Sequence, residues 1–138
     1  METYYGRVRS SQDARILFEA CSMGLLSCVT RCLSTEEQLS IRPGSVFVWD
    51  EHKADIQIWV DGRQWIPCED SASPEAYREI NHGNIPKGKD RHDCYQPDGL
   101  IRQHFGIILP TGQNLQMISY YSESDSFDLQ TPWEEPSL

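Results

Sequence analysis

The sequence lacks the features that mark membrane, secreted and disordered proteins. No stretch approaches the roughly 18 consecutive apolar residues of a membrane helix, and the N-terminus lacks the basic and then apolar pattern of a signal peptide. Hydrophobic residues form 38% of the chain, which is too many for wholesale disorder. Because 138 residues leave little room for two cores, we expect one folded domain inside the cell, without a membrane partner.

Cysteine is present in an odd number and without a C-x-x-C pair. The five are Cys21, Cys28, Cys32, Cys68 and Cys94. With no secretory signal, reduced thiols are favoured over a disulfide framework. His82 and His92 could join Cys68 and Cys94 at a zinc ion, but their spacing is poor for it. We therefore expect neither a metal site nor a cofactor.

A catalytic constellation is also lacking. A hydrolase needs a nucleophile, a base and an orienting group that converge in space. The sequence offers only His92, Asp93 and Cys94 side by side, and adjacent residues cannot point at one another in this way. We therefore predict that the chain is not an enzyme.

Positive charge is scarce, with 12 Lys and Arg against 21 Asp and Glu and a net charge of −9. This balance disfavours nonspecific DNA binding, which depends on Lys and Arg displacing counterions. Residues 122–138 hold five acidic residues and no base, so more than half of the excess lies in this tail. We predict that the tail is disordered and that the body of the domain is only mildly acidic.

Helices are predicted mainly in the first 40 residues. A short strand over 3–8 precedes a helix capped by Ser10 or Ser11, with Asp13 in its first turn and a stop near Gly24. A second helical piece is expected over 26–33. Ser34, with Glu37 three residues later, has the pattern of a capping box for a third.

Strands are predicted from residue 45 onward. Residues 45–49 and 56–60 have strand composition and predict a hairpin. The turn formers Asp61 and Gly62 place Arg63, Gln64 and Trp65 at or before a further strand, with presented side chains. Residues 73–80 fit a helix or an extended segment equally. Two last strands, 100–109 and 115–121, flank a turn, and Gly, Pro and charge mark 81–94 as a flexible linker.

Five runs of sequence occur in an order that is specific when taken together: residues 12–21, 41–51, 59–65, 77–79 and 98–121. In this order they resemble the WOPR domain, a fungal DNA-binding module with two conserved segments around a variable linker. The resemblance implies one interlocked α+β domain over 1–121, in which segments 3–80 and 95–121 share an antiparallel-rich sheet. It also implies a transcription regulator of the nucleus that recognises a short A/T-rich site on double-stranded DNA, with other transcription regulators as further candidate partners.

In this family the loop that contains Arg63 sits near the DNA. An Arg on a tight Asp-Gly turn can enter a narrow minor groove or reach a phosphate. The resemblance gives these DNA-binding candidates: Arg63, Arg42, Arg102, Arg31, Gln64 and Arg78. Four of the arginines are also open to a simpler interpretation, as solvated charges or as partners of Asp50, Asp61 and Glu79 in weak ion pairs: Arg42, Arg63, Arg78 and Arg102. Trp49, Trp59 and Trp65 could stack on bases, but core packing is favoured for them.

Several departures from the family pattern lower the DNA affinity that is expected for this chain. Gln57 and Ile58 stand where the family has two basic residues, and Val60 stands where it has Thr. Glu69 replaces a base, while Cys32 and Gln103 each replace one member of a basic pair. The alternative is therefore a divergent member with weak or lost DNA binding that acts as a protein-interaction or regulatory module.

The acidic tail yields the first testable prediction. A tethered polyanion can compete with DNA for a basic surface, although a tail that only aids solubility is the simpler alternative. If it competes, deletion of residues 122–138 will tighten DNA binding most at low salt, and the gain will shrink as screening grows. Titration of both chains with labelled duplex at several salt concentrations measures this. Equal affinity at low ionic strength would show that the tail is not an autoinhibitor.

Overall fold

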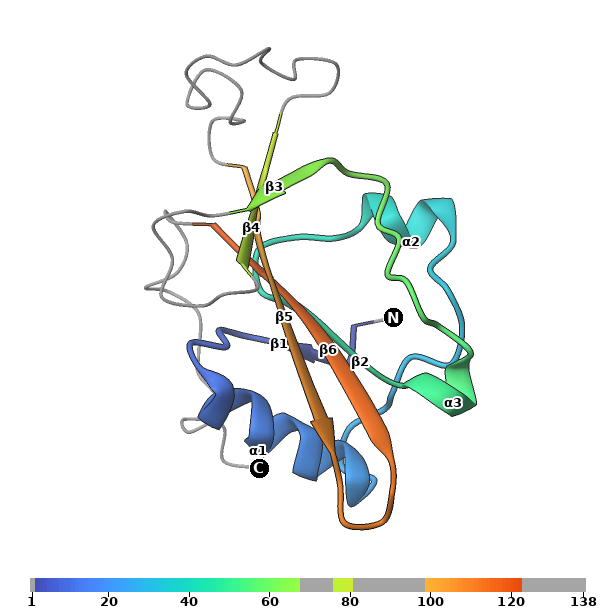
Figure 1. The fold of residues 1–138 in the computed structure, drawn as a ribbon. Coiled ribbons are helices and arrows are strands. Elements are labelled where there is room, and N and C mark those ends of the chain that lie inside the picture. The colour runs from blue at the N-terminus through green and yellow to red at the C-terminus, as the bar shows by residue number, and fades with distance from the viewer. Residues whose placement is uncertain (1, 68–75, 81–98, 123–138) are drawn as a thin grey trace.

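The computed structural model describes residues 2–67, 76–80 and 99–122 (Figure 1). The elements in chain order are β1 (Tyr4–Tyr5), α1 (Ser11–Ser22), α2 (Thr35–Leu39), β2 (Ser45–Asp50), α3 (Glu51–Ala54), β3 (Trp65–Pro67), β4 (Ala76–Glu79), β5 (Ile101–Ile108) and β6 (Asn114–Tyr121). The predicted linker 81–94, the tail after Ser122 and the helix start considered at 73–75 lie outside the described residues.

All six strands form one antiparallel sheet in the order β1-β2-β6-β5-β4-β3. β6 pairs with β2 so that Val46 lies opposite Ser119 and Asp50 lies opposite Leu115. The β5–β6 pair from the second segment is therefore inserted between strands of the first. This confirms the predicted α+β class and the sheet shared by the two segments.

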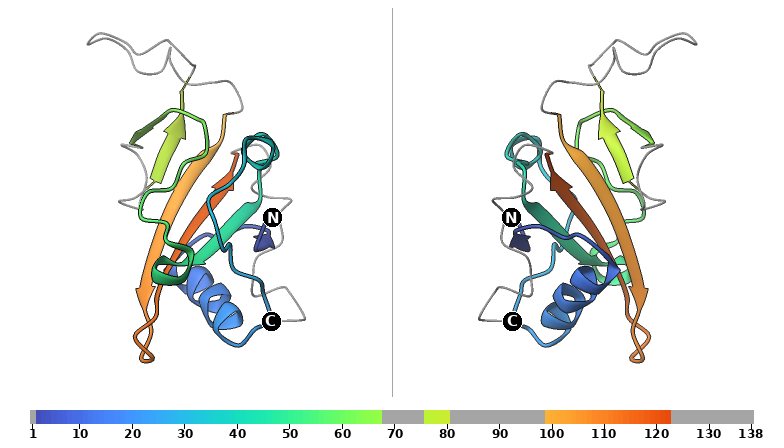
Figure 2. Two further views of the ribbon diagram at one scale, coloured as in Figure 1. Left: turned by 90° about the vertical axis from the view of Figure 1, so that its right-hand side faces the viewer. Right: turned by 90° about the vertical axis from the view of Figure 1, so that its left-hand side faces the viewer.

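β5 and β6 form a long hairpin that confirms the two last predicted strands. Its register runs from Ile101 opposite Tyr121 to Ile108 opposite Asn114. The turn is closed by hydrogen bonds from Leu109 N–H to the carbonyl of Gln113 (2.9 Å) and from Gly112 N–H to the carbonyl of Leu109 (2.8 Å). Both side views show this turn projecting beyond the neighbouring strands (Figure 2).

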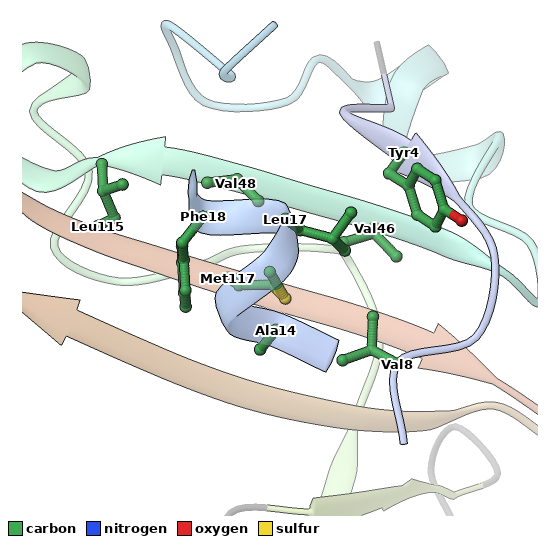
Figure 3. Close-up of a cluster of buried hydrophobic side chains, with 9 residues drawn as sticks. All are labelled: Tyr4, Val8, Ala14, Leu17, Phe18, Val46, Val48, Leu115 and Met117. Atoms are coloured by element: carbon green, nitrogen blue, oxygen red, sulfur yellow. The ribbon is translucent and has the colours of Figure 1, made fainter. Parts of the chain in front are cut away.

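Helix α1 covers one face of the sheet. Its apolar side chains point at β2 and β6 and build the first core cluster (Figure 3), which consists of Tyr4, Val8, Ala14, Leu17, Phe18, Val46, Val48, Leu115 and Met117. The predicted start is confirmed, with Ser10 as N-cap, but its side chain makes no capping hydrogen bond. The buried Asp13 carboxylate instead accepts from the backbone N–H of Arg9 at 2.9 Å, which fixes how the chain enters the helix.

The opposite face carries a second core cluster, under the segments that hold α2 and α3. The buried members are Val29, Leu33, Ile41, Phe47, Trp49, Ile56, Leu100, Ile118 and Tyr120, with Trp59 and Trp65 packed against them. Alternate residues of β2 thus serve different cores, and all of β2 is buried. α2 confirms the capping box, because Ser34 Oγ accepts from Glu37 N–H and the Glu37 carboxylate accepts from Ser34 N–H.

Two predicted elements are wrong. Residues 56–60 do not pair with β2 in a hairpin, because both edges of β2 are occupied. β6 pairs with one edge. On the other edge, Val29 N–H donates to the carbonyl of Val48, and Val48 N–H donates to Thr3 Oγ1. Asp50 caps α3 by accepting from the N–H groups of His52 and Lys53 and turns the chain away.

Residues 26–33 are not helical. The backbone of Val29 bonds to β2 and cannot also bond within a helix. Of the two options for 77–80, the extended one holds, since β4 pairs with both β3 and β5.

The two cores give a stability prediction. Leu17→Ala removes a side chain that is 0% exposed and should lower the free energy of unfolding by about 2–5 kcal/mol. Leu39→Ala, at a helical position that is 78% exposed, is the matched control and should change it by less than about 0.5 kcal/mol. Urea unfolding followed by circular dichroism measures both. Equal midpoints for the two variants would contradict this description of the core.

Candidate functional site

The buried carboxylate of Asp61 organises the loop that leads into β3. Its Oδ1 accepts from the backbone N–H of Arg63 (3.2 Å) and from Trp65 Nε1–H (3.1 Å). Its Oδ2 accepts from Arg102 Nη1–H (3.1 Å) and from the hydroxyl of Tyr120 (2.6 Å). These five residues form what we call the Asp61 cluster. It joins the loop to β5 and β6 of the second segment.

Tyr120 extends the cluster toward the aromatic side chains of the second core. Burial, followed by the nearby carboxylate of Asp61, raises the pKa of the Tyr120 hydroxyl, so this group remains a proton donor at neutral pH. The same hydroxyl accepts from Trp59 Nε1–H at 2.7 Å. The ring of Trp59 stacks on Trp49, with centroids 4.7 Å apart and planes 14° apart.

The core interpretation of the three tryptophans is confirmed. Trp49 is 3% exposed, and Trp59 and Trp65 are packed against the same cluster. Trp65 also lies under the guanidinium of Arg102, at 4.8 Å from its ring centroid. The rings therefore hold the loop in place and are not free to stack on a base.

Gly62 forms the predicted tight turn after Asp61. It has a φ of +75°, and a Cβ at this position would meet Gln38 Oε1 of α2 at 2.8 Å. The positive φ is therefore what favours glycine here, because the flexible end of the Gln38 side chain can shift.

Arg63, on this turn, is held and only half-exposed. Its guanidinium lies 3.2 Å from Glu79 Oε2 and donates to the carbonyl of Ile41 at 3.2 Å, and 23% of its side chain is exposed. The expectation that residues 63–65 present their side chains is therefore met only in part, because all three are half-buried. Gln64 Oε1 is buried and has no hydrogen-bond partner among the described residues.

Arg42 follows α2, directly after Ile41, whose carbonyl accepts from the Arg63 guanidinium. Its Nε and Nη2 donate to the two carboxylate oxygens of Glu2 at 3.2 and 3.0 Å, and its guanidinium lies over the ring of Tyr5 at 4.0 Å. The side chain is 57% exposed. Arg42 thus presents a guanidinium plane to solvent while one acid occupies its donors.

Arg31 is arranged in the same way on the segment before α2. It donates to both oxygens of Glu37, at 2.7 and 3.2 Å, and is 59% exposed. The hydrogen bond from Arg31 is the main cause that lowers the pKa of Glu37 to about 2, so this pair stays charged down to acidic pH. The expected ion pairs are present at Arg63, with Glu79, and at Arg102, with Asp61. Arg31 and Arg42 are also paired, with Glu37 and Glu2, which were not expected as their partners.

The partners that the sequence does not indicate are Glu2, Glu37 and Tyr120, whereas Asp61 and Glu79 were expected as acidic partners. Glu79, in β4, pairs with Arg63 and also accepts from Leu100 N–H at 3.1 Å. Arg78, the remaining candidate, lies in β4 opposite Ile66 of β3. Nothing local in the sequence pairs Asp61 with Arg102, because their contact depends on how β5 and β6 are inserted.

A groove of about 280 Å³ opens beside the Asp61 cluster. Its walls are Trp49, Glu51, Ile56, Gln57, Ile58, Trp59, Tyr77, Arg102, His104, Gln116 and Ile118. A chain of polar contacts runs along it: His104 Nε2 lies 2.7 Å from Gln116 Oε1, and Gln116 Nε2 donates to Asn114 Oδ1 at 2.6 Å. Ile58, at one wall, is 78% exposed.

Within the described part of the chain, no group of His, Cys, Asp and Glu could hold a metal ion. The four residues considered for zinc (Cys68, His82, His92 and Cys94) lie outside it. No described helix has both the length and the apolarity to cross a membrane.

Comparison with known proteins decides the family. The model of the Gti1/Pac2 family matches residues 3–93. The chain belongs to the Gti1/Pac2 family. This confirms the resemblance seen in the sequence, because Gti1/Pac2 proteins are the WOPR-domain transcription regulators of fungi. The Gti1/Pac2 chain is accordingly a transcription-regulator domain and not an enzyme.

Curated relatives and a solved structure agree. The cAMP-independent regulatory protein pac2 of Schizosaccharomyces pombe is 33% identical over 100% of this chain and 78% of its own length. The global transcription regulator sge1 of Gibberella moniliformis is 34% identical over 86% of this chain, but the chain spans only 38% of it. The WOPR domain of Wor1 from Candida albicans, solved with 13bp dsDNA, has a TM-score of 0.79 and 26% identity over 99% of this chain and 88% of that one.

The Asp61 cluster predicts that substitutions at Asp61 and Arg102 have non-additive effects on the free energy of unfolding. Asp61→Asn leaves the 18%-exposed Arg102 guanidinium without its anion and should cost about 3–5 kcal/mol. Arg102→Leu in turn leaves the Asp61 carboxylate without its cation. The double variant avoids an unpaired charge, so urea unfolding should show it destabilised by clearly less than the sum. If the two costs add to within about 0.5 kcal/mol, the ion pair does not contribute as described.

Proposed function

We propose that this chain binds double-stranded DNA as the sequence-specific domain of a nuclear transcription regulator and recognises a short A/T-rich site. One observation carries the proposal: 99% of the chain matches, at a TM-score of 0.79, a WOPR domain solved with 13bp dsDNA. A match of this extent includes both segments of the interlocked sheet and the loop that Asp61 holds. The family of transcription regulators supports the nuclear location.

The loop from residue 57 to residue 64 is the part we assign to groove contact. The Asp61 cluster fixes its backbone before DNA arrives, so little conformational entropy remains to be lost on binding. Arg63 has a side chain long enough to turn from Glu79 toward a phosphate or the minor groove. That exchange replaces one anion with another, but it leaves the 12%-exposed Glu79 carboxylate without this cation, which offsets part of the gain.

Arg42 and Arg31 are assigned to phosphate contact. Their side chains are 57% and 59% exposed, and each has a single carboxylate partner at the surface. Exposed pairs of this kind are worth about 0–1 kcal/mol, so a phosphate can displace the carboxylate at low cost. Arg102, Arg78 and Gln64 lie deeper, and Arg102 supports the loop through Asp61 instead of leaving it.

The carboxylate partners predict modest, salt-sensitive affinity. Each arginine that moves to DNA leaves an acid near a phosphate, and repulsion offsets part of the gain. Because fewer counterions are released than by an unpaired basic surface, the affinity is lower and falls less steeply with salt than it would for such a surface.

A second candidate function rests on the apolar positions of the loop. Ile58 and Val60 are 78% and 57% exposed, where the family pattern has a basic residue and Thr. Together with the adjacent groove they form a surface suited to contact with another protein, such as a second transcription regulator. This function would hold if DNA binding has been weakened or lost.

Titration with labelled duplexes separates the two functions. We expect binding to an A/T-rich duplex that is tighter than to a G/C-rich duplex of equal length and that weakens from low to physiological salt. Arg42→Gln should reduce the affinity and lower the slope of log K against log salt by about one. Arg15→Gln is the matched control, because Arg15 is also exposed and paired with one acid, Glu19, but lies on α1. Absence of salt-sensitive binding even at low salt would favour the protein-interaction function.

A further inference from the structure

Two thiols meet at the C-terminal end of α1, remote from the Asp61 cluster. Cys21 belongs to the last turn of the helix, and Cys28 lies in the segment that follows. The chain reverses between them, with Gly24 N–H bonded to the carbonyl of Cys21 (3.1 Å) and Leu25 N–H bonded to the carbonyl of Ala20 (2.9 Å). Both cysteines pack against the first core cluster and line the same cavity, which places the two thiols close together.

The pair has unequal acidity and lies in an accessible place. The interaction between the two thiols is the main cause that lowers the pKa of Cys28 to about 7, and it raises the pKa of Cys21. A cavity of about 250 Å³ opens on both sulfur-bearing side chains. Its charged lining consists of Asp50 and Lys53, whose effects on Cys28 are opposite in sign. Both cysteines are half-buried and free.

We propose that Cys21 and Cys28 form a peroxide-reactive dithiol, a modification site in which Cys28 is the attacking sulfur and Cys21 resolves it to a disulfide. The proposal does not depend on DNA binding. It needs a nucleophilic thiolate, a second thiol in contact with it and room for a small oxidant, and the cavity provides the third condition.

The chemistry balances with hydrogen peroxide as the oxidant. The Cys28 thiolate attacks one peroxide oxygen, the O–O bond breaks, and hydroxide leaves and takes up a proton to give water, so that Cys28 becomes a sulfenic acid. The sulfur of Cys21 then attacks the Cys28 sulfur, the S–O bond breaks and a second water leaves. The two thiols lose two electrons and two protons in total, and a dithiol reductant reverses the change.

The whole chain provides a direct test. After brief exposure to hydrogen peroxide and alkylation of remaining thiols, trypsin releases residues 16–31, which contain Cys21 and Cys28 but not Cys32. We expect this peptide to be unalkylated and lighter by two hydrogens, and to form about tenfold faster than Cys32 is oxidised. If both thiols of 16–31 stay alkylatable while Cys32 is oxidised, the proposal is overturned.

Three variants assign the roles. In Cys21→Ser, Cys28 should stop at the sulfenic acid and be trapped by dimedone; in Cys28→Ser, Cys21 should remain a thiol. Cys32→Ser is the matched control and should leave the 16–31 peptide unchanged.

Alkylation of the unmodified protein should have its midpoint near pH 7 at Cys28 and move toward about 8.5 in Cys21→Ser. Trapping on Cys21 instead of Cys28 would contradict the assignment, and the wild-type peptide decides the outcome if a variant fails to fold.

Discussion

The Asp61 carboxylate lies buried on the sheet face that α1 does not cover, and donors from the loop, from β5 and from β6 meet on its two oxygens. Taking a carboxylate out of water is costly unless it is paired and fully hydrogen-bonded. Here the cost is offset only when all these donors are in place. The carboxylate thus makes the conformation of the loop depend on the presence of β5 and β6 from the second segment.

This coupling explains why the candidate interface has its particular composition. Asp61 and Gly62 fix the backbone conformation of the loop. Its outer side chains, Gln57, Ile58 and Val60, are exposed and do not contribute to the core. Such positions can change identity without loss of stability. A family member can therefore keep the scaffold of a DNA-binding loop while its surface chemistry drifts.

Local patterns predicted the elements whose bonding is local. The capping box at Ser34 and the turn between β5 and β6 depend on residues close in sequence, and both were foreseen. The strand expected at 56–60 was wrong: Ile56 is 2% exposed and its carbonyl accepts from Trp49 Nε1–H, whereas Ile58 and Val60 are 78% and 57% exposed. The alternation of apolar residues shows neither which side chains are buried nor whether a strand edge is free to pair.

The sequence indicates the arginines of the candidate site and weak ion pairs for four of them, but it does not determine which acid each arginine contacts. Arg42 with Glu2 and Arg102 with Asp61 are each about forty residues apart along the chain, and pairs at that separation follow from strand order, which composition and spacing do not determine. The family resemblance indicated which arginines belong to the candidate site. Only the fold shows that its members differ in burial, and hence that some can reach a ligand while others support the loop.

The insertion of β6 between β2 and β5 has a consequence for how the protein is made. Until residues 114–121 leave the ribosome, β2 has no partner along the edge that β6 will occupy, although its side chains are among the most apolar in the chain. Contacts between residues so distant in sequence form slowly, and an unpaired apolar strand favours aggregation while it waits. The first segment can therefore complete its sheet only after the hairpin of β5 and β6 has been synthesised.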